Sequence, residues 1–266
     1  MNASAAPPPA ARDTRRRRTV TAADRWEPVQ RLRTYEQVMA QIEQRIAAGQ
    51  LQPGDHLPSE RELAALLGVS RPSLRESLRV LEALGVVEIR RGGGSEGGAA
   101  LRSVPGTGLV SLLKLQLALS HFSWNDVLET RLALELWSAR EAAYRSTDDD
   151  HRELGAILDQ MDDPSIETGD FNCLDAEFHV RISQSTGNAL TAYFMGSLRT
   201  AIHHQMVEMY AALADWRETA KTVRREHREI LQALVDRDGP LAAQRMQAHI
   251  CDFYDLKISG SELAGE

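Results

Sequence analysis

Apolar residues recur at helical spacing through most of the chain, and this periodicity predicts its architecture. From Gly108 onward the pattern indicates consecutive amphipathic helices, and no segment there alternates like a strand. The expected helices cover residues 108–120, 124–145, 149–161, 170–186, 189–212, 214–237 and 239–257. The second half of the chain is therefore predicted to be an all-helical bundle of six or seven helices.

The first part of the chain has a different order of elements. A helix is expected over 28–48, because apolar residues at helical spacing occupy one face there. The glycines and prolines that follow directly end it. Ser59 is a predicted N-cap for a helix over 60–67, and Ser70 is the predicted N-cap of the next helix, which ends before Gly85. Two helices joined by a turn of about four residues that contains a glycine form a helix-turn-helix.

After Gly85 the period changes to that of a strand. Residues 86–90 ("VVEIR") predict one strand, the glycine-rich stretch "RGGGSEGG" a hairpin tip, and residues 99–104 ("AALRSV") the returning strand. A hairpin directly after such a helix is a wing. The expected fold class is thus mainly α: an N-terminal winged helix-turn-helix domain with a small β-hairpin wing, followed by the helical bundle.

Composition narrows the class of protein. Hydrophobic residues make up 42% of the chain and aromatic residues 5%, so the core must be largely aliphatic, which suits a helical protein. No apolar run approaches the roughly 20 residues that span a bilayer, and the N-terminus lacks the apolar segment of a secretory signal. The two cysteines are too few for a disulfide framework. We expect a soluble, cytoplasmic protein with no membrane partner.

Charge is divided unevenly along the chain. Residues 1–105 carry 16 Lys and Arg against 12 Asp and Glu, whereas residues 106–266 carry 15 against 26. A basic front half joined to an acidic back half indicates two functions in one chain. The expected organisation is a disordered basic tail (1–27), the winged domain (28–105), the helical domain (106–258) and a flexible C-terminus (259–266).

A row of arginines points to nucleic acid. Arg71, Arg75 and Arg79 stand four residues apart, on one line along the predicted helix, while its leucines occupy another face. Such a row on a lone helix is most often a solvated surface. Here it begins in the first turn of the second helix of a helix-turn-helix, where the N-terminus already favours anions. This context favours DNA binding.

The segment "LPSERELAALLGVSRPSLRESLRVLEALGVVEIRRGGGSEG" resembles the winged-helix domain of GntR-family bacterial transcription regulators, and "GQLQPGDHLPSERELA" belongs to the same signature. The resemblance implies contacts with operator DNA from seven residues of the helix-turn-helix and the wing: Arg61, Ser70, Arg71, Ser73, Arg75, Arg91 and Gly92. Two features depart from the family pattern, Pro72 in the recognition helix and the unusually glycine-rich wing.

Four polar residues of the helical half form a candidate metal site. Asp175 and His179 stand four apart on one helix, and His227 and His249 lie on the last two helices, each sharing a face with apolar residues. One inward carboxylate and three inward imidazoles suit a divalent ion. The alternative is that each is a separate polar residue satisfied by local hydrogen bonds.

The helical half also resembles the FCD ligand-binding domain of the FadR-type branch of that family. The matching segments are "ETRLALE", "LDAEFHVRISQSTGN", "EHREILQALVDRDGPLA" and "MQAHI". This resemblance implies a divalent metal held by one Asp and three His, with zinc as the first candidate and nickel or manganese as alternatives. It also implies that Arg131 points into the cavity and binds an effector carboxylate. Arg199 and His203 are further candidates for lining that cavity.

The leading hypothesis is a bacterial DNA-binding regulator, a homodimer on a palindromic operator, whose DNA affinity depends on a small carboxylate effector bound at a metal-containing cavity. Repression is the favoured output, with activation left open. The competing hypothesis is a metal-dependent hydrolase fused to a DNA-binding domain. A hydrolase would need a general base over the metal-bound water, and Glu177 is predicted to point away from it. We therefore expect no enzymatic activity.

Overall fold

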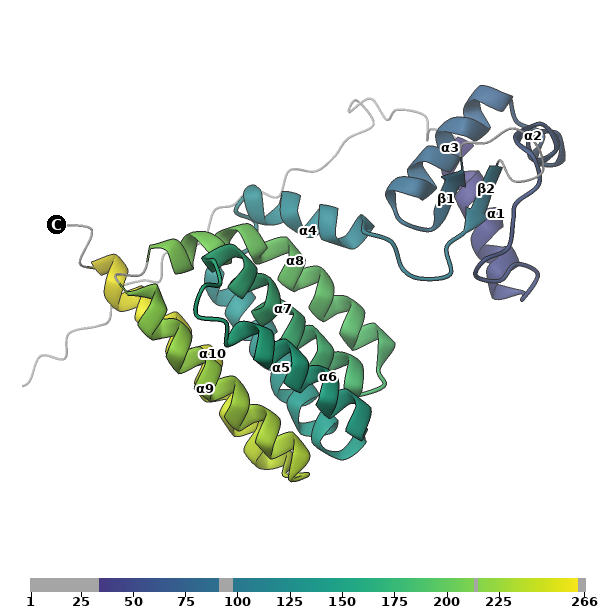
Figure 1. Cartoon of the computed structure of the whole chain (residues 1–266). Coiled ribbons are helices and arrows are strands. Elements are labelled where there is room, and N and C mark those ends of the chain that lie inside the picture. The colour runs from purple at the N-terminus through teal and green to yellow at the C-terminus, as the bar shows by residue number, and fades with distance from the viewer. Residues whose placement is uncertain (1–33, 91–97, 213–214, 263–266) are drawn as a thin grey trace, which may run out of the picture.

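The protein folds into two domains connected by a linker, as its computed structural model shows (Figure 1). The structure describes residues 34–90, 98–212 and 215–262. The expected basic tail, and the wing-tip residues Arg91 and Gly92, lie outside the described residues. Within the described part, the predicted fold class is confirmed: helices dominate, and a single small hairpin follows the helix-turn-helix.

The N-terminal domain contains three helices, α1 (Thr34–Ala47), α2 (Glu60–Leu67) and α3 (Arg71–Ala83). The capping box before α2 is present: the Ser59 side chain accepts from the Glu62 backbone, and the Glu62 carboxylate accepts from the Ser59 backbone. Gly68 then ends α2 in the left-handed conformation, with φ of 66°. These local signals fix the turn between α2 and α3, as the sequence predicted.

A two-stranded antiparallel hairpin completes this domain. Strand β1 (Val87–Arg90) pairs with β2 (Gly98–Leu101), with Val87 opposite Leu101 and Arg90 opposite Gly98. The hairpin packs on the helices through a shared apolar core. That core contains Val38, Ile42, Leu63, Leu74, Leu78, Leu81, Val87 and Leu101.

One leucine of the predicted apolar face is not buried. Leu84 is 53% exposed, whereas Leu74, Leu78 and Leu81 are at most 2% exposed. The reason is that α3 ends at Ala83 and Leu84 is its C-cap, followed by Gly85 with a φ of 76°. The chain thus leaves the helical path before Leu84 reaches the core.

In the described residues the C-terminal domain has seven helices, α4 to α10, and α4 lies on the compact bundle that the other six form (Figure 1). The bounds follow the predicted ranges within a few residues, apart from α10, which continues past 257. They are α4 (Gly108–Ala118), α5 (Trp124–Arg145), α6 (Asp148–Met161), α7 (Thr168–Ser185), α8 (Ala189–Ala211), α9 (Trp216–Val235) and α10 (Gly239–Glu262).

The bundle has one continuous core with an unusual polar part. Its apolar side chains include Phe171, Phe178, Ile202, Tyr210 and Ile230, all at most 1% exposed. The same interior also buries charged or titratable side chains on α5, α7, α8, α9 and α10. None of the helices in the described ranges is long and apolar enough to cross a membrane.

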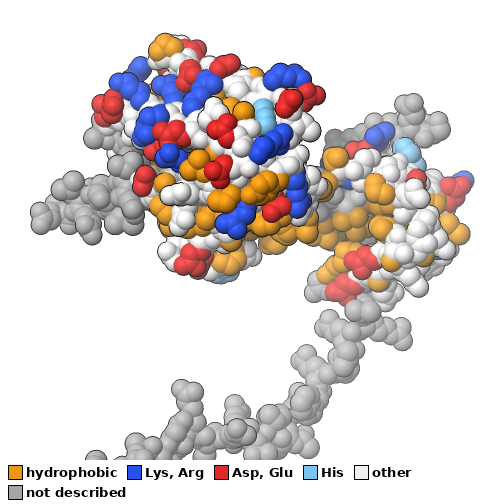
Figure 2. Space-filling view, turned by 90° about the horizontal axis from the view of Figure 1, so that it is seen from below, with side chains coloured by type: hydrophobic (Ala, Val, Ile, Leu, Met, Phe, Trp, Pro, Cys, Tyr) orange, Lys and Arg blue, Asp and Glu red, His pale blue; other side chains and the backbone are white. Residues whose placement is uncertain are grey.

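Helix α4 differs from the others because it is apolar on nearly every side yet has no buried residue. It packs on α8, and its leucines Leu112 and Leu115 and its C-cap Leu119 are 53%, 63% and 63% exposed. Figure 2 shows hydrophobic side chains gathered along one side of the larger domain and continuing toward the smaller one. Monomeric proteins rarely leave such a surface uncovered.

Candidate functional site

The recognition helix α3 separates its apolar and basic side chains cleanly. Arg71, Arg75 and Arg79 are exposed, while the leucines three or four positions away are buried. Arg61 on α2 is also exposed. Ser70 caps α3 by accepting a hydrogen bond from the Ser73 backbone N–H at 3.2 Å. The first turn of α3 thus presents cations and backbone donors to solvent, which suits a phosphate or a base edge.

Two of these arginines already have acidic partners. The guanidinium of Arg75 donates to Glu60 on α2, with 2.6 Å from Nη2 to Oε2 and 3.2 Å from Nε to the same oxygen. Arg79 lies 3.7 Å from Glu76. Arg61 and Arg71 form no ion pair with any described residue. Arg75 must therefore exchange Glu60 for DNA before it can contact an operator.

The four candidate metal ligands come together inside the bundle. Asp175 and His179 are on α7, His227 is on α9 and His249 is on α10, and each is at most 4% exposed. One ligand atom from each lies within 4.8 Å of the others. They therefore form one cluster and are not four separate polar residues.

Two of the spacings between their atoms match those around one divalent ion, and the third is slightly wider. The Nε2 atoms of His227 and His249 are 3.2 Å apart, and Asp175 Oδ1 lies 3.4 Å from His227 Nε2 and 3.8 Å from His179 Nε2. Around one ion with metal–ligand distances of about 2.1 Å, ligand atoms lie roughly 3–3.5 Å apart. The Nε2 of His179 is buried and has no hydrogen-bond partner. A cation would satisfy it, so the residues fit the group.

In two of the three imidazoles a carboxylate contacts the Nδ1 atom, on the opposite edge of the ring from Nε2. Glu226 Oε2 lies 2.9 Å from His249 Nδ1, and Glu135 contacts Nδ1 of His179. Metal-binding histidines commonly donate the second ring N–H to a carboxylate, which orients the ring and leaves Nε2 free for the ion. Nδ1 of His227 is buried without such a partner. Sequence reasoning missed Glu135 and Glu226, although Glu135 sits among leucines and Glu226 directly precedes His227.

Burial and neighbouring charges set the protonation of the cluster. Burial alone would raise the pKa of Asp175, but Arg199 and the three histidines outweigh it and hold that pKa well below its usual range. Burial lowers the pKa of His179 to about 4, with Glu135 opposing the shift. Burial also lowers the pKa of His227. At neutral pH the cluster therefore offers the Asp175 carboxylate and the neutral imidazoles of His179 and His227, the forms that bind metals.

Two buried arginines pair with different carboxylates at the cluster. Arg131, 2% exposed, donates from Nε to Glu135 at 2.8 Å, so it supports the carboxylate behind His179. Arg199, 3% exposed, donates from Nη2 to Oδ2 of Asp175. Sequence reasoning assigned both arginines to an effector. In the structure each one holds a carboxylate of the cluster, and Asp175 is itself a candidate ligand.

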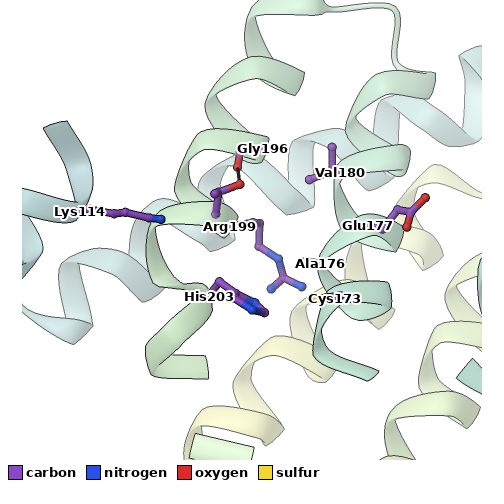
Figure 3. Close-up of a pocket in the computed structure, with 9 residues that line it drawn as sticks. Lys114, Cys173, Ala176, Glu177, Val180, Gly196, Arg199 and His203 are labelled. Carbon is purple, nitrogen blue, oxygen red and sulfur yellow. Dashed lines mark hydrogen bonds between the residues drawn. The ribbon is translucent and has the colours of Figure 1, made fainter. Parts of the chain in front are cut away.

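A pocket of about 380 Å³ opens beside the cluster, between α4, α7 and α8. Arg199 and His203 of α8 both line it. Lys114 of α4 lines it too, although the sequence did not predict a role for Lys114. In the close-up, Arg199 and His203 point from α8 toward α7, and Lys114 points in from α4 (Figure 3). Arg131 is not one of its lining residues. The pocket therefore unites two of the three effector candidates.

The position of Glu177 tests the alternative that the protein is a metal-dependent hydrolase. Glu177, the acid considered as a general base, is exposed, and its carboxylate points away from Arg199 (Figure 3). The four candidate ligands lie on the buried side of α7, away from Glu177. The geometry thus places no free carboxylate of α7 where it could activate a metal-bound water.

Comparison with known families matches both halves of the chain. The description "Bacterial regulatory proteins, gntR family" fits residues 34–96, and "FCD domain" fits residues 126–252. A curated relative, the uncharacterized HTH-type transcriptional regulator YcbG of Bacillus subtilis, is 30% identical over 89% of this chain and 95% of its own length. The Glc operon transcriptional activator of Escherichia coli is 28% identical over 86% of this chain and 92% of its own.

A solved structure supports the same conclusion. The GntR protein of Streptococcus agalactiae superposes with a TM-score of 0.53 at 26% identity, covering 82% of this chain and 96% of that one. The matched relatives carry the names of transcription regulators, and the similarity extends over both domains. The resemblance noted in the sequence is therefore confirmed for both halves of the chain.

Proposed function

The chain belongs to the GntR family of bacterial transcription regulators and carries an FCD domain, and we propose that its operator affinity depends on a metal ion and a small carboxylate effector. The single observation that carries this proposal is the buried convergence of Asp175, His179, His227 and His249. Burying these groups without a partner ion would be costly. Zinc is the first candidate, with nickel or manganese as alternatives.

The bound ion would hold three helices together. Asp175 and His179 belong to α7, His227 to α9 and His249 to α10, so a shared ion links elements that are far apart in the sequence. A divalent ion supplies a strong positive charge at which a carboxylate can complete the coordination. Arg199 and His203 would assist from the pocket side, and Arg131 would act through Glu135.

On the DNA side, we assign direct contacts to Arg61, Arg71 and Arg75, with Ser70 and Ser73 assisting at the start of α3. The wing residues Arg91 and Gly92 remain part of this proposal, as minor-groove contacts. A bacterial protein that binds operator DNA in this way would act in the cytoplasm. Repression is the proposed output, and activation is the alternative.

A homodimer accounts for the exposed leucines of α4. Leu112, Leu115 and Leu119 form an apolar strip that no described part of the chain covers, and a second copy would cover it. A two-fold dimer would present two recognition helices, so its operator would be palindromic, with half-sites about one helical turn or a multiple apart.

The test uses the full chain purified without chelator. We expect metal analysis to find about one divalent ion per chain, and in vitro selection from genomic DNA to recover fragments with an inverted repeat. Sedimentation should give a dimer. Adding a chelator should change affinity for the selected DNA, and transcription in vitro from that DNA should fall when the protein is added. Metal-free protein that binds its operator unchanged would refute the metal-dependent part. Increased transcription would assign activation.

A further inference from the structure

Arg199 is a buried cation with unused hydrogen-bonding capacity. It is 3% exposed, and only its Nη2 finds an acceptor, Oδ2 of Asp175. Its Nε and Nη1 are buried and have no hydrogen-bond partner in the described part of the chain. A guanidinium can donate five hydrogen bonds, and buried donors without acceptors are costly. The side chain is therefore incomplete without a further acceptor.

The pocket beside Arg199 suits an anion. Lys114 reaches it from α4 and His203 lies one turn after Arg199 on α8, so three basic side chains surround it (Figure 3). Lys114 is exposed and forms no ion pair with any described residue. Among the lining residues that the structure describes, Glu177 is the one acid, and it points away from Arg199 (Figure 3). A volume of about 380 Å³ is that of a small-molecule site.

Arg199 also competes with a metal for Asp175. One oxygen of the Asp175 carboxylate receives the Arg199 hydrogen bond, while the other faces the histidines. A divalent ion at the cluster would therefore sit close to a guanidinium, and two cations near one carboxylate repel each other. An anion on the pocket side of Arg199 would offset that repulsion.

We propose that the pocket between α4, α7 and α8 binds a small dicarboxylate, and that its occupation strengthens metal binding at the Asp175 cluster. One carboxylate pairs with the free nitrogens of Arg199, and the other is held by Lys114. By thermodynamic linkage the metal strengthens dicarboxylate binding by the same factor. The second half of this inference rests on the proposed metal site.

The position of Lys114 gives this site a regulatory consequence. Helix α4 is the first element after the winged domain, and Lys114 projects from it toward α8 (Figure 3). A dicarboxylate that joins Lys114 to Arg199 would draw α4 toward α7 and α8. A ligand can shift the arrangement of the dimer's two DNA-binding domains only through a contact that it makes in one arrangement and not in another.

Cys173 provides a reporter for the pocket. It is exposed and lines the pocket, whereas Cys251, the other cysteine, lies on α10. We expect succinate to slow the alkylation of Cys173 by iodoacetamide in the full-length protein by roughly fivefold or more, at constant ionic strength. Alkylation of Cys251 should not change. Succinate should no longer protect Cys173 in Lys114→Ala. It should still protect Cys173 in Lys221→Ala, which removes the same charge from an exposed position of α9.

The coupling is measured separately by titrating zinc against a chromophoric chelator. Succinate should tighten zinc binding by roughly fivefold or more in the wild type and in Lys221→Ala, and by much less in Lys114→Ala. Arg199→Met removes the competing cation, so its zinc affinity should rise and no longer depend on succinate. Because Arg199→Met leaves a buried Asp175 unpaired and could fail to fold, Lys114→Ala remains the deciding variant.

The outcomes separate this inference from the proposed function. If succinate protects Cys173 equally in the wild type and in Lys114→Ala, or protects it in neither, the dicarboxylate site is wrong. If zinc binds but its affinity ignores succinate, the coupling is wrong and the metal site stands. If zinc does not bind the wild type, the metal part of the proposed function and the coupling both fall, while protection of Cys173 would still establish the dicarboxylate site.

Discussion

The hydroxyl of Tyr193 on α8 donates a hydrogen bond to the backbone oxygen of Gly106 in the linker, with 3.0 Å between the two oxygens. Gly106 in turn lies against Gly85, just after the recognition helix: a Cβ built on Gly106 would be 2.6 Å from the Gly85 Cα. A Cβ on Gly108 would be 2.6 Å from the Leu84 oxygen. The Tyr193 hydrogen bond and these close backbone approaches therefore connect α8, through the linker, to the end of α3.

Removing the Tyr193 hydroxyl should loosen this connection without unfolding the protein. Tyr193→Phe loses one hydrogen bond, which costs about 0.5–1.5 kcal/mol of unfolding free energy. We expect operator affinity without zinc to stay near that of the wild type, and the zinc-dependent change in affinity to shrink. Binding titrations with and without zinc measure both. Tyr144→Phe, at an exposed position of α5, is the matched control, and an unchanged zinc response in Tyr193→Phe would contradict the connection.

The glycine contact itself can be tested by adding a methyl group. Gly106→Ala places a Cβ against backbone atoms of Gly85 that cannot rotate away, so the linker must shift. Such overpacking costs about 1–3 kcal/mol, and operator binding should weaken with it. Gly155→Ala on α6 is the control, because no atom lies within 4 Å of its added Cβ. Thermal unfolding should show Gly155→Ala at least as stable as the wild type. Equal behaviour of the two variants would mean that the linker adjusts freely.

The arginines of α3 should differ in how they respond to substitution. Arg71→Ala should cost roughly 1–3 kcal/mol of operator binding if Arg71 contacts a base. Arg75→Ala should weaken operator binding by less than Arg71→Ala, because Arg75 must give up part of its pairing with Glu60 when it binds DNA. Glu60→Gln should therefore strengthen binding slightly. Arg140→Ala, on the exposed surface of α5, is the control in titrations at fixed salt. Wild-type affinity in both Arg71→Ala and Arg75→Ala would place the recognition surface elsewhere.

Local signals made most of the fold predictable from the sequence. Caps such as Ser59 and Ser70 and the left-handed Gly68 act within a few residues, so helix ends follow from short segments. The metal cluster was predictable because Asp175 and His179 share one helical face and the other two histidines lie on apolar faces. The carboxylates that contact the histidine ligands were not predictable. Glu135 contacts His179 across 44 positions of sequence, and only the packing of the helices decides such a contact.

Exposure was harder to predict than helicity. Leu84 has the spacing of a core residue, yet helix termination leaves it at the surface. Arg131 was predicted to face the effector cavity, and the structure shows it donating a hydrogen bond to the buried Glu135. Lys114 was passed over because α4 has no polar face to mark it, and its place in the pocket depends on α8 lying beside α4. Tertiary neighbours, which periodicity does not specify, decide all three positions.

Removing one metal ligand should lower metal content and stability together. His227→Ala deletes a buried ligand on α9, and an ion that binds only the folded state stabilises it in proportion to its affinity. We expect less than one ion per chain, a lower melting temperature in zinc, and operator binding that no longer responds to zinc. His204→Ala, at an exposed position of α8, should behave as the wild type. Full zinc occupancy in His227→Ala, His249→Ala and Asp175→Asn alike would show that the cluster is not the site.

The metal-free protein should lose stability as the pH falls below about 6.5, which is the ordinary pKa of histidine. In the folded state burial lowers the pKa of His179 to about 4, so this ring stays neutral while its unfolded counterpart takes up a proton. Stability falls wherever the unfolded state binds more protons, so His179 adds nothing above about pH 7 and opposes folding progressively between about pH 6.5 and 4.

The full loss from His179 is on the order of 3 kcal/mol by this linkage, and His227 shifts in the same direction. Urea unfolding in the presence of a chelator, at several pH values between about 8 and 4.5, measures it. His179→Gln should flatten the dependence, because glutamine does not titrate, whereas His204→Gln should leave it unchanged. An unfolding free energy that stays constant between about pH 7 and 5 would mean that these histidines are charged in the folded protein. The neutral, metal-ready state of the cluster would then be wrong.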